Sequence, residues 1–393
     1  SPSRGLGDVY KRQVGCHIMT KRKATNMEVK KNNRNQIFRF VCGHDKVSNP
    51  DISYALKLSL PTVTQNTKEL IEKGLIEEVG ELESTGGRRA KALSVKKDAC
   101  FAIGLDITKN HIGLLLTNLT GEILKYDRIV QAYRTEEVYF YAVNEKMEQF
   151  LEESGVNREK ISGIGISFPG IVDLEKQMIT YSHILEVQNL PLAEVSRFFA
   201  YPCSFFNDAN AGALAEGIRM KEDERFFYLS LSNTVGGAIL NESKLQQGKA
   251  FRCGEVGHMT IVPDGKLCYC GKKGCLDAYC SAKILSGKMN GKLEQFFEKL
   301  KQKDPDAKEV WDQYTSYLAI AVNNIHMVLD CDIILGGYAG GYLEPYIPEI
   351  WEKVKKRNTF EEERLFIRAC SYKIETAALG AALKVIEDFI ALV

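Results

Sequence analysis

A histidine and three cysteines lie close together in the second half of the chain. His258 precedes Cys268 by ten residues, and Cys270 and Cys275 follow within the stretch CYCGKKGC. One imidazole and three thiolates form a closed tetrahedral ligand set for Zn²⁺, and the intervening glycines permit the sharp chain reversal that such a set requires. The spacing therefore predicts a structural zinc site, in which protein fills all four positions. The alternative is a group of ordinary buried cysteines.

The charge of the chain is unevenly distributed. Residues 1–97 hold 19 Lys and Arg residues against 10 Asp and Glu residues, a net charge of +9. Residues 98–393 hold 33 against 41, a net charge of −8. A basic N-terminal part on an acidic body indicates an anionic polymer as partner, and nucleic acid is the usual candidate. A disordered basic arm would give the same charge.

Apolar residues recur at helical spacing in the basic part, as in three short helices. Asn49 and Pro50 predict the N-cap and the first turn of the second helix, a third helix begins near Pro61, and Gly74 ends it. This spacing is typical of a helix-turn-helix. The third helix begins with polar side chains of the kind that reach base edges in the major groove: Thr62, Thr64, Gln65, Asn66 and Lys68.

Two strands around a glycine turn follow in the stretch LIEEVGELESTGGRRAKALSV. Arg88, Arg89 and Lys91 lie at the tip, where they can enter a minor groove or contact phosphates. Helices and hairpin together predict a winged helix-turn-helix DNA-binding domain over residues 30–97, and the stretch resembles the winged-helix domain of bacterial repressors. A small helical domain that docks onto another protein has the same periodicity and is the alternative.

The body after Lys97 alternates apolar strands with charged helices. The stretch FAIGLDITKNHIGLLLTNLTGEILKYDRIV predicts three strands joined by tight turns, and a helix from Glu136 to Ser154 and a further strand follow. A second set of the same kind begins at FFYLSLSNTVGGAILNESKL and ends with the helix TAALGAALKVIEDFI. The duplication predicts an α/β protein of two related lobes with a cleft between them, over residues 98–393.

Two stretches of the body make a resemblance to the ROK family specific. They are FNDANAGALAEG, from Phe206 to Gly217, and GEVGHMTIVPDGKLCYCGKKGCLDAYCS, from Gly254 to Ser281. The family contains sugar kinases and sugar-responsive repressors. The resemblance implies an actin-like ATPase fold (ribonuclease H-like, with two lobes) for the body, and membership of the regulator branch that carries an N-terminal winged helix.

The resemblance also implies a carbohydrate site. Asn207 and Asp208 match the family's sugar-binding pair, whose aspartate is the general base in kinase members. Glu255 matches a glutamate that binds a sugar hydroxyl, and a zinc-held His258 offers its second nitrogen to another. Asp277 stands where the family usually has a glutamate. From the residues alone, Asp208 is also expected to be the N-cap of the alanine-rich helix that follows it.

Two loops that hold the phosphates of ATP in kinase members are altered here. The first loop reads Asp-x-Gly-Gly-Thr-Lys in those kinases, whereas Asp106 is followed by ITKNH in this chain. The second loop is close to Gly-Thr-Gly, and its counterpart is Ser232-Asn233-Thr234. Side chains at the former glycine positions obstruct the approach of phosphates to backbone N–H groups. The two losses together predict that the protein does not bind ATP tightly and is not an enzyme.

No run of apolar residues approaches the roughly 18 residues of a membrane helix. With no visible export signal, the 11 cysteines indicate reduced thiols, one metal site and a cytoplasmic protein. The stretch DVYKRQ, residues 8–13, matches the translation of a sequencing-adaptor string. We therefore expect residues 1–18 to be an artefact or disordered, with translation starting at Met19.

These observations predict a sugar-responsive, DNA-binding transcription repressor of carbohydrate-use genes, with Zn²⁺ as a structural metal. Its expected partners are operator DNA and a small sugar, and the two-fold symmetry of operators predicts a homodimer or a dimer of dimers. Family members often carry Pro-Asn-Leu where this chain has His183-Ile184-Leu185, so the sequence does not identify the sugar. Two alternatives remain: a ROK-type ATP-dependent sugar kinase that uses Asp208 as general base, and a carbohydrate-sensing scaffold without a DNA function.

Overall fold

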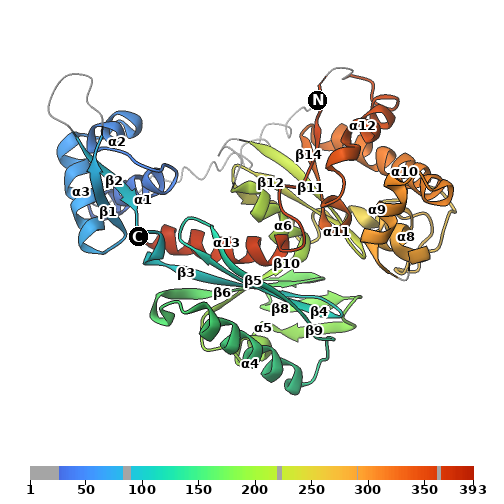
Figure 1. Ribbon diagram of the computed structural model, residues 1–393, viewed down its shortest axis with the longest axis horizontal. Helices are drawn as coiled ribbons and strands as arrows, with labels where there is room; N and C mark the ends of the chain where they lie inside the picture. The colour runs from blue at the N-terminus through green and yellow to red at the C-terminus, as the bar shows by residue number, and fades with distance from the viewer. Residues whose placement is uncertain (1–25, 83–89, 219–223, 290, 361–363) are drawn as a thin grey trace, which may run out of the picture. The chain divides into compact units, whose positions relative to one another are not determined.

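The chain forms two compact units, Ser1–Ser94 with Val393 and Val95–Leu392 (Figure 1). The expected artefact at residues 1–18 and the wing tip with Arg88 and Arg89 lie outside the described residues. The structure is a computed structural model, and the residues it describes are 26–82, 90–218, 224–289, 291–360 and 364–393.

The N-terminal unit contains three helices followed by a two-stranded hairpin, in the order expected for a winged helix-turn-helix. Its apolar core consists of fully buried side chains from all three helices, among them Phe38, Ile52 and Leu70. The elements are α1 (Asn26–Cys42), α2 (Asn49–Leu56), α3 (Leu60–Glu72), β1 (Ile76–Glu81) and β2 (Lys91–Val95).

Helix caps explain where α2 and α3 begin. The N-cap of α2 is Ser48, which forms a capping box with Asp51, so the expectation that Asn49 is the N-cap was wrong by one residue. Ser59 caps α3 by accepting a hydrogen bond from the Thr62 N–H at 3.3 Å. Gly74 follows the end of α3 with φ +68°, and this confirms its predicted role as the terminating glycine.

The first lobe of the body is built on a five-stranded sheet in the order β10-β6-β3-β4-β5. Strands β3, β6 and β10 are parallel, whereas β3, β4 and β5 form an antiparallel meander. A small antiparallel sheet, β7-β8-β9, extends this lobe. The elements are η1 (Lys97–Ala99), β3 (Phe101–Ile107), β4 (His111–Asn118), β5 (Ile123–Val130), α4 (Glu137–Ser154), η2 (Arg158–Lys160), β6 (Ile161–Phe168), β7 (Ile171–Asp173), β8 (Met178–Ser182), β9 (Val187–Pro191), α5 (Leu192–Ser196) and β10 (Cys203–Asn207).

The second lobe repeats this strand pattern in the order β13-β12-β11-β14-β15. Again a meander of three antiparallel strands is continued by two parallel ones, which confirms the predicted duplication. The elements that follow β10 in the chain are α6 (Asp208–Gly217), β11 (Arg225–Leu231), β12 (Val235–Asn241), β13 (Lys244–Leu245), η3 (Val256–His258), α7 (Asp277–Cys280), α8 (Ala282–Ser286), η4 (Gly287–Met289), α9 (Leu293–Lys301), α10 (Pro305–Leu329), β14 (Asp332–Gly336), α11 (Gly337–Gly340), η5 (Glu344–Tyr346), α12 (Ile347–Lys355), β15 (Ile367–Ala369) and α13 (Thr376–Leu392). The last of them, α13, returns to the first-lobe sheet.

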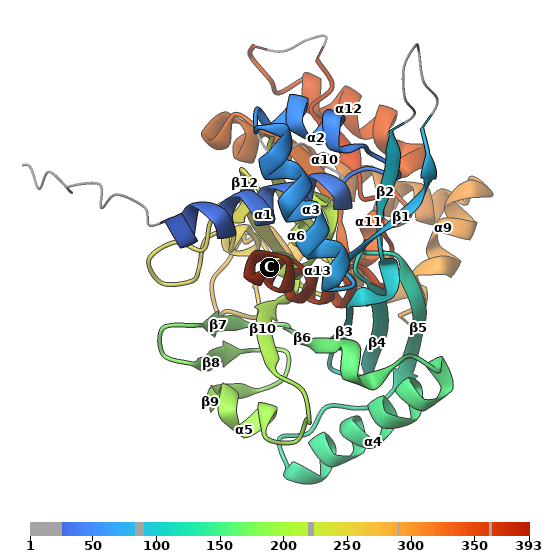
Figure 2. The same ribbon diagram turned by 90° about the vertical axis from the view of Figure 1, so that its left-hand side faces the viewer.

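Helices α6 and α13 pack against each other, and α13 also crosses the first-lobe sheet (Figures 1 and 2). Glycines allow this close packing. A Cβ added at Gly104 would lie 1.9 Å from the carbonyl oxygen of Ala378, and one at Gly380 would lie 1.7 Å from that of Ala211. Helix α6 also packs on the second-lobe sheet, so the start of α6 lies where the two lobes meet.

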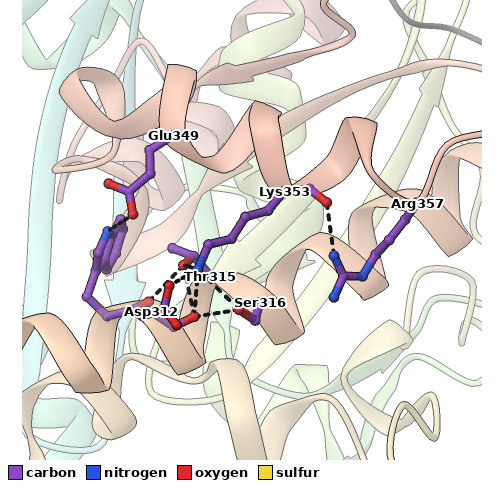
Figure 3. A network of polar contacts seen from close by, with 7 residues as sticks. Asp312, Thr315, Ser316, Glu349, Lys353 and Arg357 are labelled. Atoms are coloured by element: carbon purple, nitrogen blue, oxygen red, sulfur yellow. Dashed lines mark hydrogen bonds and ion pairs between the residues drawn. The ribbon is translucent and has the colours of Figure 1, made fainter.

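The outer layer of the second lobe is held together by a polar network between α10 and α12 (Figure 3). The ammonium group of Lys353 lies 2.6 Å from a carboxylate oxygen of Asp312 and 2.7 Å from the hydroxyl of Thr315. The indole N–H of Trp311 donates to Glu349 at 3.0 Å. These contacts fix the two helices over the core of the lobe.

None of the helices in the described part of the chain has the length and apolar character needed to cross a membrane.

Candidate functional site

The side chains of His258, Cys268, Cys270 and Cys275 converge, as the spacing predicted. Their ligand atoms all lie within 4.8 Å of one another. The Cys270 and Cys275 sulfurs are 3.7 Å apart, and the Cys268 sulfur is 3.9 Å from Nδ1 of His258. Two sulfurs each about 2.3 Å from a tetrahedral zinc ion would be about 3.8 Å apart. The donor set and its spacing therefore fit a zinc ion.

Glycine conformation shapes the loop that carries the cysteines. Gly271 and Gly274 both have φ +81°, a region that side-chained residues rarely adopt. At Gly274 a Cβ would also lie 1.8 Å from the carbonyl oxygen of Val262. The sequence argument for a glycine-dependent chain reversal is confirmed at both positions.

The ring of His258 has its two nitrogens in different surroundings. Nδ1 faces the Cys268 sulfur, whereas Nε2 lies 3.2 Å from the hydroxyl oxygen of Tyr269. The nitrogen that was expected to face a sugar is thus adjacent to a tyrosine of the same loop. The sequence argument missed Tyr269, because nothing in the cysteine spacing indicates where the residue between two ligands points.

Asn207 and Asp208 lie at the start of α6, between the two lobes. Asn207 is the N-cap: its Oδ1 accepts from the N–H groups of Ala209 and Asn210, at 2.9 and 3.2 Å. The expectation that Asp208 caps this helix was therefore wrong by one residue. The Asn207 amide also donates to the carbonyl of Gly170 at 2.9 Å, so both ends of this side chain hold the local structure.

Asp208 faces a cavity of about 790 Å³ in the body, which Asp106 also lines. Loss of hydration and, to a smaller extent, the nearby charges of Asp106 and Glu255 together raise the pKa of Asp208 to about 7, against the opposing effect of a backbone hydrogen bond from Ala209. Loss of hydration also raises the pKa of Asp106 to about 6, although the nearby Ser167 hydroxyl and the charge of Arg128 oppose this. The two carboxyl groups thus hold protons more readily than exposed aspartates do.

The other two predicted carboxylates differ in their surroundings. Glu255 precedes η3. Burial raises the pKa of its carboxyl group, and the charges of His258 and Arg252 offset this rise only in part. Asp277 is only 6% exposed, and its Oδ2 accepts a 2.6 Å hydrogen bond from the N–H of Val235. Asp277 is therefore bound to the chain directly after the second altered loop.

The first altered loop forms hydrogen bonds between its own residues. The N–H of Thr108 donates to the carbonyl of His111 at 3.0 Å, and the N–H of His111 donates to the Thr108 hydroxyl at 3.1 Å. Lys109, at the tip, forms an ion pair with Glu186 at 3.6 Å. Donors that are used inside the turn are not available to a phosphate, in addition to the lost glycines.

The second altered loop also has an internal hydrogen bond, and its Ser232 side chain is hydrogen-bonded to Tyr338. The N–H of Ser232 donates to the carbonyl of Thr234 at 3.2 Å, while the Ser232 hydroxyl accepts from the N–H of Tyr338 at 3.3 Å. The N–H of Gly337 donates to the Tyr228 hydroxyl at 3.0 Å. Both loops line the cavity, and several of their backbone donors already have acceptors within the protein.

The five side chains of α3 that were expected to read DNA differ in their exposure. Thr64, Gln65 and Lys68 are exposed, and Thr62 is half-buried with its hydroxyl 2.8 Å from that of Ser59. Asn66 is only 2% exposed and donates to the Thr62 carbonyl at 2.8 Å, which corrects the expectation that it faces outward. The cause is packing, since Asn66 follows the buried side of the helix with Val63 and Leu70.

Of the three expected wing residues, Lys91 is the one that lies in the described part of the hairpin. Lys91 is exposed and its ammonium group lies 2.7 Å from a carboxylate oxygen of Glu78 on the neighbouring strand. This surface ion pair offsets the positive charge of Lys91 at the start of β2.

Known proteins resemble this chain over nearly its whole length. The xylose repressor of Caldicellulosiruptor bescii is 27% identical over 388 residues, covering 92% of this chain and 97% of the repressor. The N-acetylglucosamine repressor of Escherichia coli O157:H7 is 26% identical over 273 residues, covering 69% of this chain and 67% of that protein.

Solved structures share the fold. A ROK family transcriptional regulator, a homologue of the Escherichia coli MLC protein, superimposes with a TM-score of 0.74 at 22% identity, covering 93% of this chain and 98% of the regulator. A ROK family glucokinase from Streptomyces griseus, in complex with glucose and AMPPNP, superimposes with a TM-score of 0.64 at 22% identity, covering 72% of this chain and 98% of the kinase.

Family profiles match both parts of the chain. The profile for winged helix-turn-helix DNA-binding domains matches residues 32–77, and the ROK profile matches residues 102–388. The chain belongs to the ROK family and carries an N-terminal winged helix-turn-helix.

Proposed function

We propose that this protein is a carbohydrate-responsive transcription repressor. The observation that carries the proposal is the combination, in one chain, of a winged helix-turn-helix with a ROK body in which both altered loops use backbone N–H groups in hydrogen bonds within the loop. The names of the related xylose and N-acetylglucosamine repressors support it. The proposal assigns DNA binding to residues 30–97 and effector binding to residues 98–393, in a cytoplasmic protein that acts on chromosomal DNA.

The proposed effector is a sugar held where the lobes meet. Asp208 and Glu255 offer carboxylate acceptors to vicinal hydroxyls, and His258 offers an N–H donor. Asn207 and Asp277 hold the surrounding backbone, and we assign them a supporting role in the same site. Binding of the sugar shifts the protein between a DNA-competent and an incompetent state, which requires a different sugar affinity in each.

The proposed metal is a structural Zn²⁺ held by His258, Cys268, Cys270 and Cys275. The four donors and their mutual distances support this assignment. When bound, the ion supplies a cross-link that fixes the loop beside Glu255 and the ring of His258. Protein ligands would fill all four coordination positions of the ion, so none would be open to a substrate. The proposal therefore gives the ion no catalytic role.

The proposed DNA contacts are made by the exposed residues of α3, namely Thr64, Gln65 and Lys68, with Thr62 at the edge of the face and Asn66 as a buried support. Arg88, Arg89 and Lys91 are assigned to the wing. Because most operators are two-fold symmetric, the proposal includes a homodimer or a dimer of dimers.

The test is a binding experiment with DNA fragments selected from the source genome. We expect tight, salt-dependent binding that is weakened by D-xylose, N-acetyl-D-glucosamine or D-glucose. Changing Gln65→Ala should weaken specific binding, by about 1–3 kcal/mol if it contacts a base, and Lys68→Ala should reduce the salt slope by about one. Lys244→Ala, an exposed lysine of the body, is the control.

The paired change Arg88→Ala with Arg89→Ala should weaken binding to all DNA sequences and reduce the salt dependence by about one to two contacts. Unchanged DNA binding in this double variant and in Gln65→Ala would favour a carbohydrate-sensing scaffold over a repressor.

The competing function is an ATP-dependent sugar kinase with Asp208 as general base. One observation favours it: Asp208 faces the cavity with a pKa raised to about 7, which suits a base at neutral pH. The internally bonded loop donors oppose it. A coupled phosphorylation assay over the same sugars decides between them, since turnover that disappears in Asp208→Asn would establish the kinase.

A further inference from the structure

Tyr269 lies beside His258, one of the proposed sugar-binding residues. It stands between the metal-ligand positions Cys268 and Cys270, and its hydroxyl oxygen is 3.2 Å from Nε2 of His258. The Tyr269 and His258 rings meet edge to face, with centroids 5.3 Å apart. The tyrosine therefore occupies the one nitrogen of His258 that faces away from the cysteine ligands.

The same tyrosine also contacts the other lobe. Its ring stacks on the imidazole of His183, with ring centroids 4.3 Å apart and planes inclined by 15°. His183 lies in the turn between β8 and β9, in the small sheet that extends the first lobe. The Tyr181 hydroxyl lies 3.4 Å from Nδ1 of His183. Ring side chains thus form a continuous series of contacts from the first lobe to the loop of the proposed zinc ligands in the second lobe: Tyr181, His183, Tyr269 and His258.

Neither Tyr269 nor His183 is among the described residues that line the cavity. Asp208 and Ile184 line it, but Glu255, His258 and Asp277 are not among the described residues of its wall. Of the proposed sugar-binding groups, Asp208 thus lies in the cavity wall, whereas His258 lies beside Tyr269. A sugar that binds Nε2 of His258 must compete with the Tyr269 hydroxyl for that nitrogen.

The chemistry of His258 makes this a competition. A metal held through Nδ1 would leave the proton of the neutral imidazole on Nε2, which would then donate one hydrogen bond. The Tyr269 hydroxyl lies within hydrogen-bond distance of that nitrogen, and a sugar hydroxyl that binds the same nitrogen must take its place. Tyr269 is 39% exposed, so the displaced ring can turn toward water.

We infer that Tyr269 is a gate of the carbohydrate site, and that a sugar opens it by displacing the Tyr269 hydroxyl from His258. Displacement also breaks the stack on His183, so occupancy of the site is coupled to the contact between the two lobes. This inference rests on the proposed function, because it requires that the ligand is a carbohydrate. It adds the residue pair through which the ligand acts on the lobes.

The test measures the Kd of D-xylose, N-acetyl-D-glucosamine and D-glucose by calorimetry for the zinc-loaded full chain. Tyr269→Phe keeps the ring and removes the competing hydroxyl, so the Kd should fall about fivefold, the equivalent of one net hydrogen bond. His183→Ala removes the stack and should lower the Kd about threefold. Tyr141→Phe, an exposed tyrosine of α4, should leave the Kd unchanged.

The outcomes separate the gate from the proposed function. Wild-type binding with an unchanged or higher Kd in Tyr269→Phe overturns the gate and leaves the effector role intact. Binding by Tyr269→Phe alone supports the gate in its strongest form. If neither protein binds any of the three sugars, the gate fails together with the effector half of the proposed function. Equal zinc content in all variants establishes that the metal loop is preserved.

Discussion

The carboxylate of Asp277 accepts a 2.6 Å hydrogen bond from the backbone N–H of Val235, 42 positions earlier in the sequence. Val235 follows the second altered loop, and Asp277 follows Cys275, the last cysteine of the proposed zinc site, by two residues. The contact therefore ties the loop with the proposed zinc ligands to the chain beside the cavity. It also occupies a donor beside the loop that would hold phosphates in a kinase.

This contact predicts a stability difference between two substitutions. Asp277→Ala leaves the N–H of Val235 without its acceptor, and since Val235 is buried, we expect a loss of about 1–3 kcal/mol in the free energy of unfolding. Asp277→Asn keeps an oxygen acceptor and should lose less. Urea unfolding measures both. Equal stability of Asp277→Ala and wild type would mean that water or another group replaces the carboxylate.

Removal of the proposed zinc should destabilise the body. Cys270→Ser is expected to lose the one equivalent of zinc measured by mass spectrometry and to unfold at a lower urea concentration, because structural zinc contributes on the order of 10 kcal/mol in small domains. Cys253→Ser is the matched control, since Cys253 lies outside the cluster of ligand atoms. Full zinc content in Cys270→Ser would contradict the assignment.

Close helix packing predicts that Gly380→Ala is destabilising. The added Cβ would lie 1.7 Å from the carbonyl oxygen of Ala211, a backbone atom that moves only with α6. Overpacking of this kind costs about 1–3 kcal/mol. Gly287→Ala has open space around the added methyl group and should be tolerated. Thermal unfolding of the two variants provides the comparison, and equal transition temperatures would refute the packing described for α6 and α13.

The carboxyl groups in the cavity predict a pH dependence of stability. The pKa of Asp208 is raised to about 7 and that of Asp106 to about 6, so the folded protein binds more protons than the unfolded chain between about pH 4 and 7. Their contribution to stability is present below the unfolded pKa and is lost as the pH rises through the folded values.

Asp208→Asn removes one of these groups. Relative to wild type, the variant should gain stability as the pH is raised from 4.5 to 8, as measured by urea unfolding at both values. Asp264→Asn changes an exposed carboxylate at a positive φ that asparagine also tolerates, and should show no such trend. A constant difference between Asp208→Asn and wild type across this range would show that Asp208 does not titrate there.

Much of the fold and part of the candidate site follow from local sequence patterns. The three helices and hairpin, the two strand sets and the metal cluster were predicted because periodicity, turn residues and ligand spacing act over short distances. Three single positions were predicted wrongly. Asn66 is buried where exposure was expected, because that side of α3 packs inward. Ser48 and Asn207 cap their helices one residue earlier than predicted, because their side-chain oxygens accept hydrogen bonds from the first backbone N–H groups of those helices.

The sequence by itself determined the family, the duplicated lobes, the four metal donors and the loss of the phosphate-loop glycines. Only the tertiary structure decided that Asp277 bonds to Val235, and that Tyr269 joins His258 to His183. These partners are distant along the chain or depend on the direction of one side chain. Their contacts arise from the packing of two lobes, and no local pattern of residues encodes that geometry.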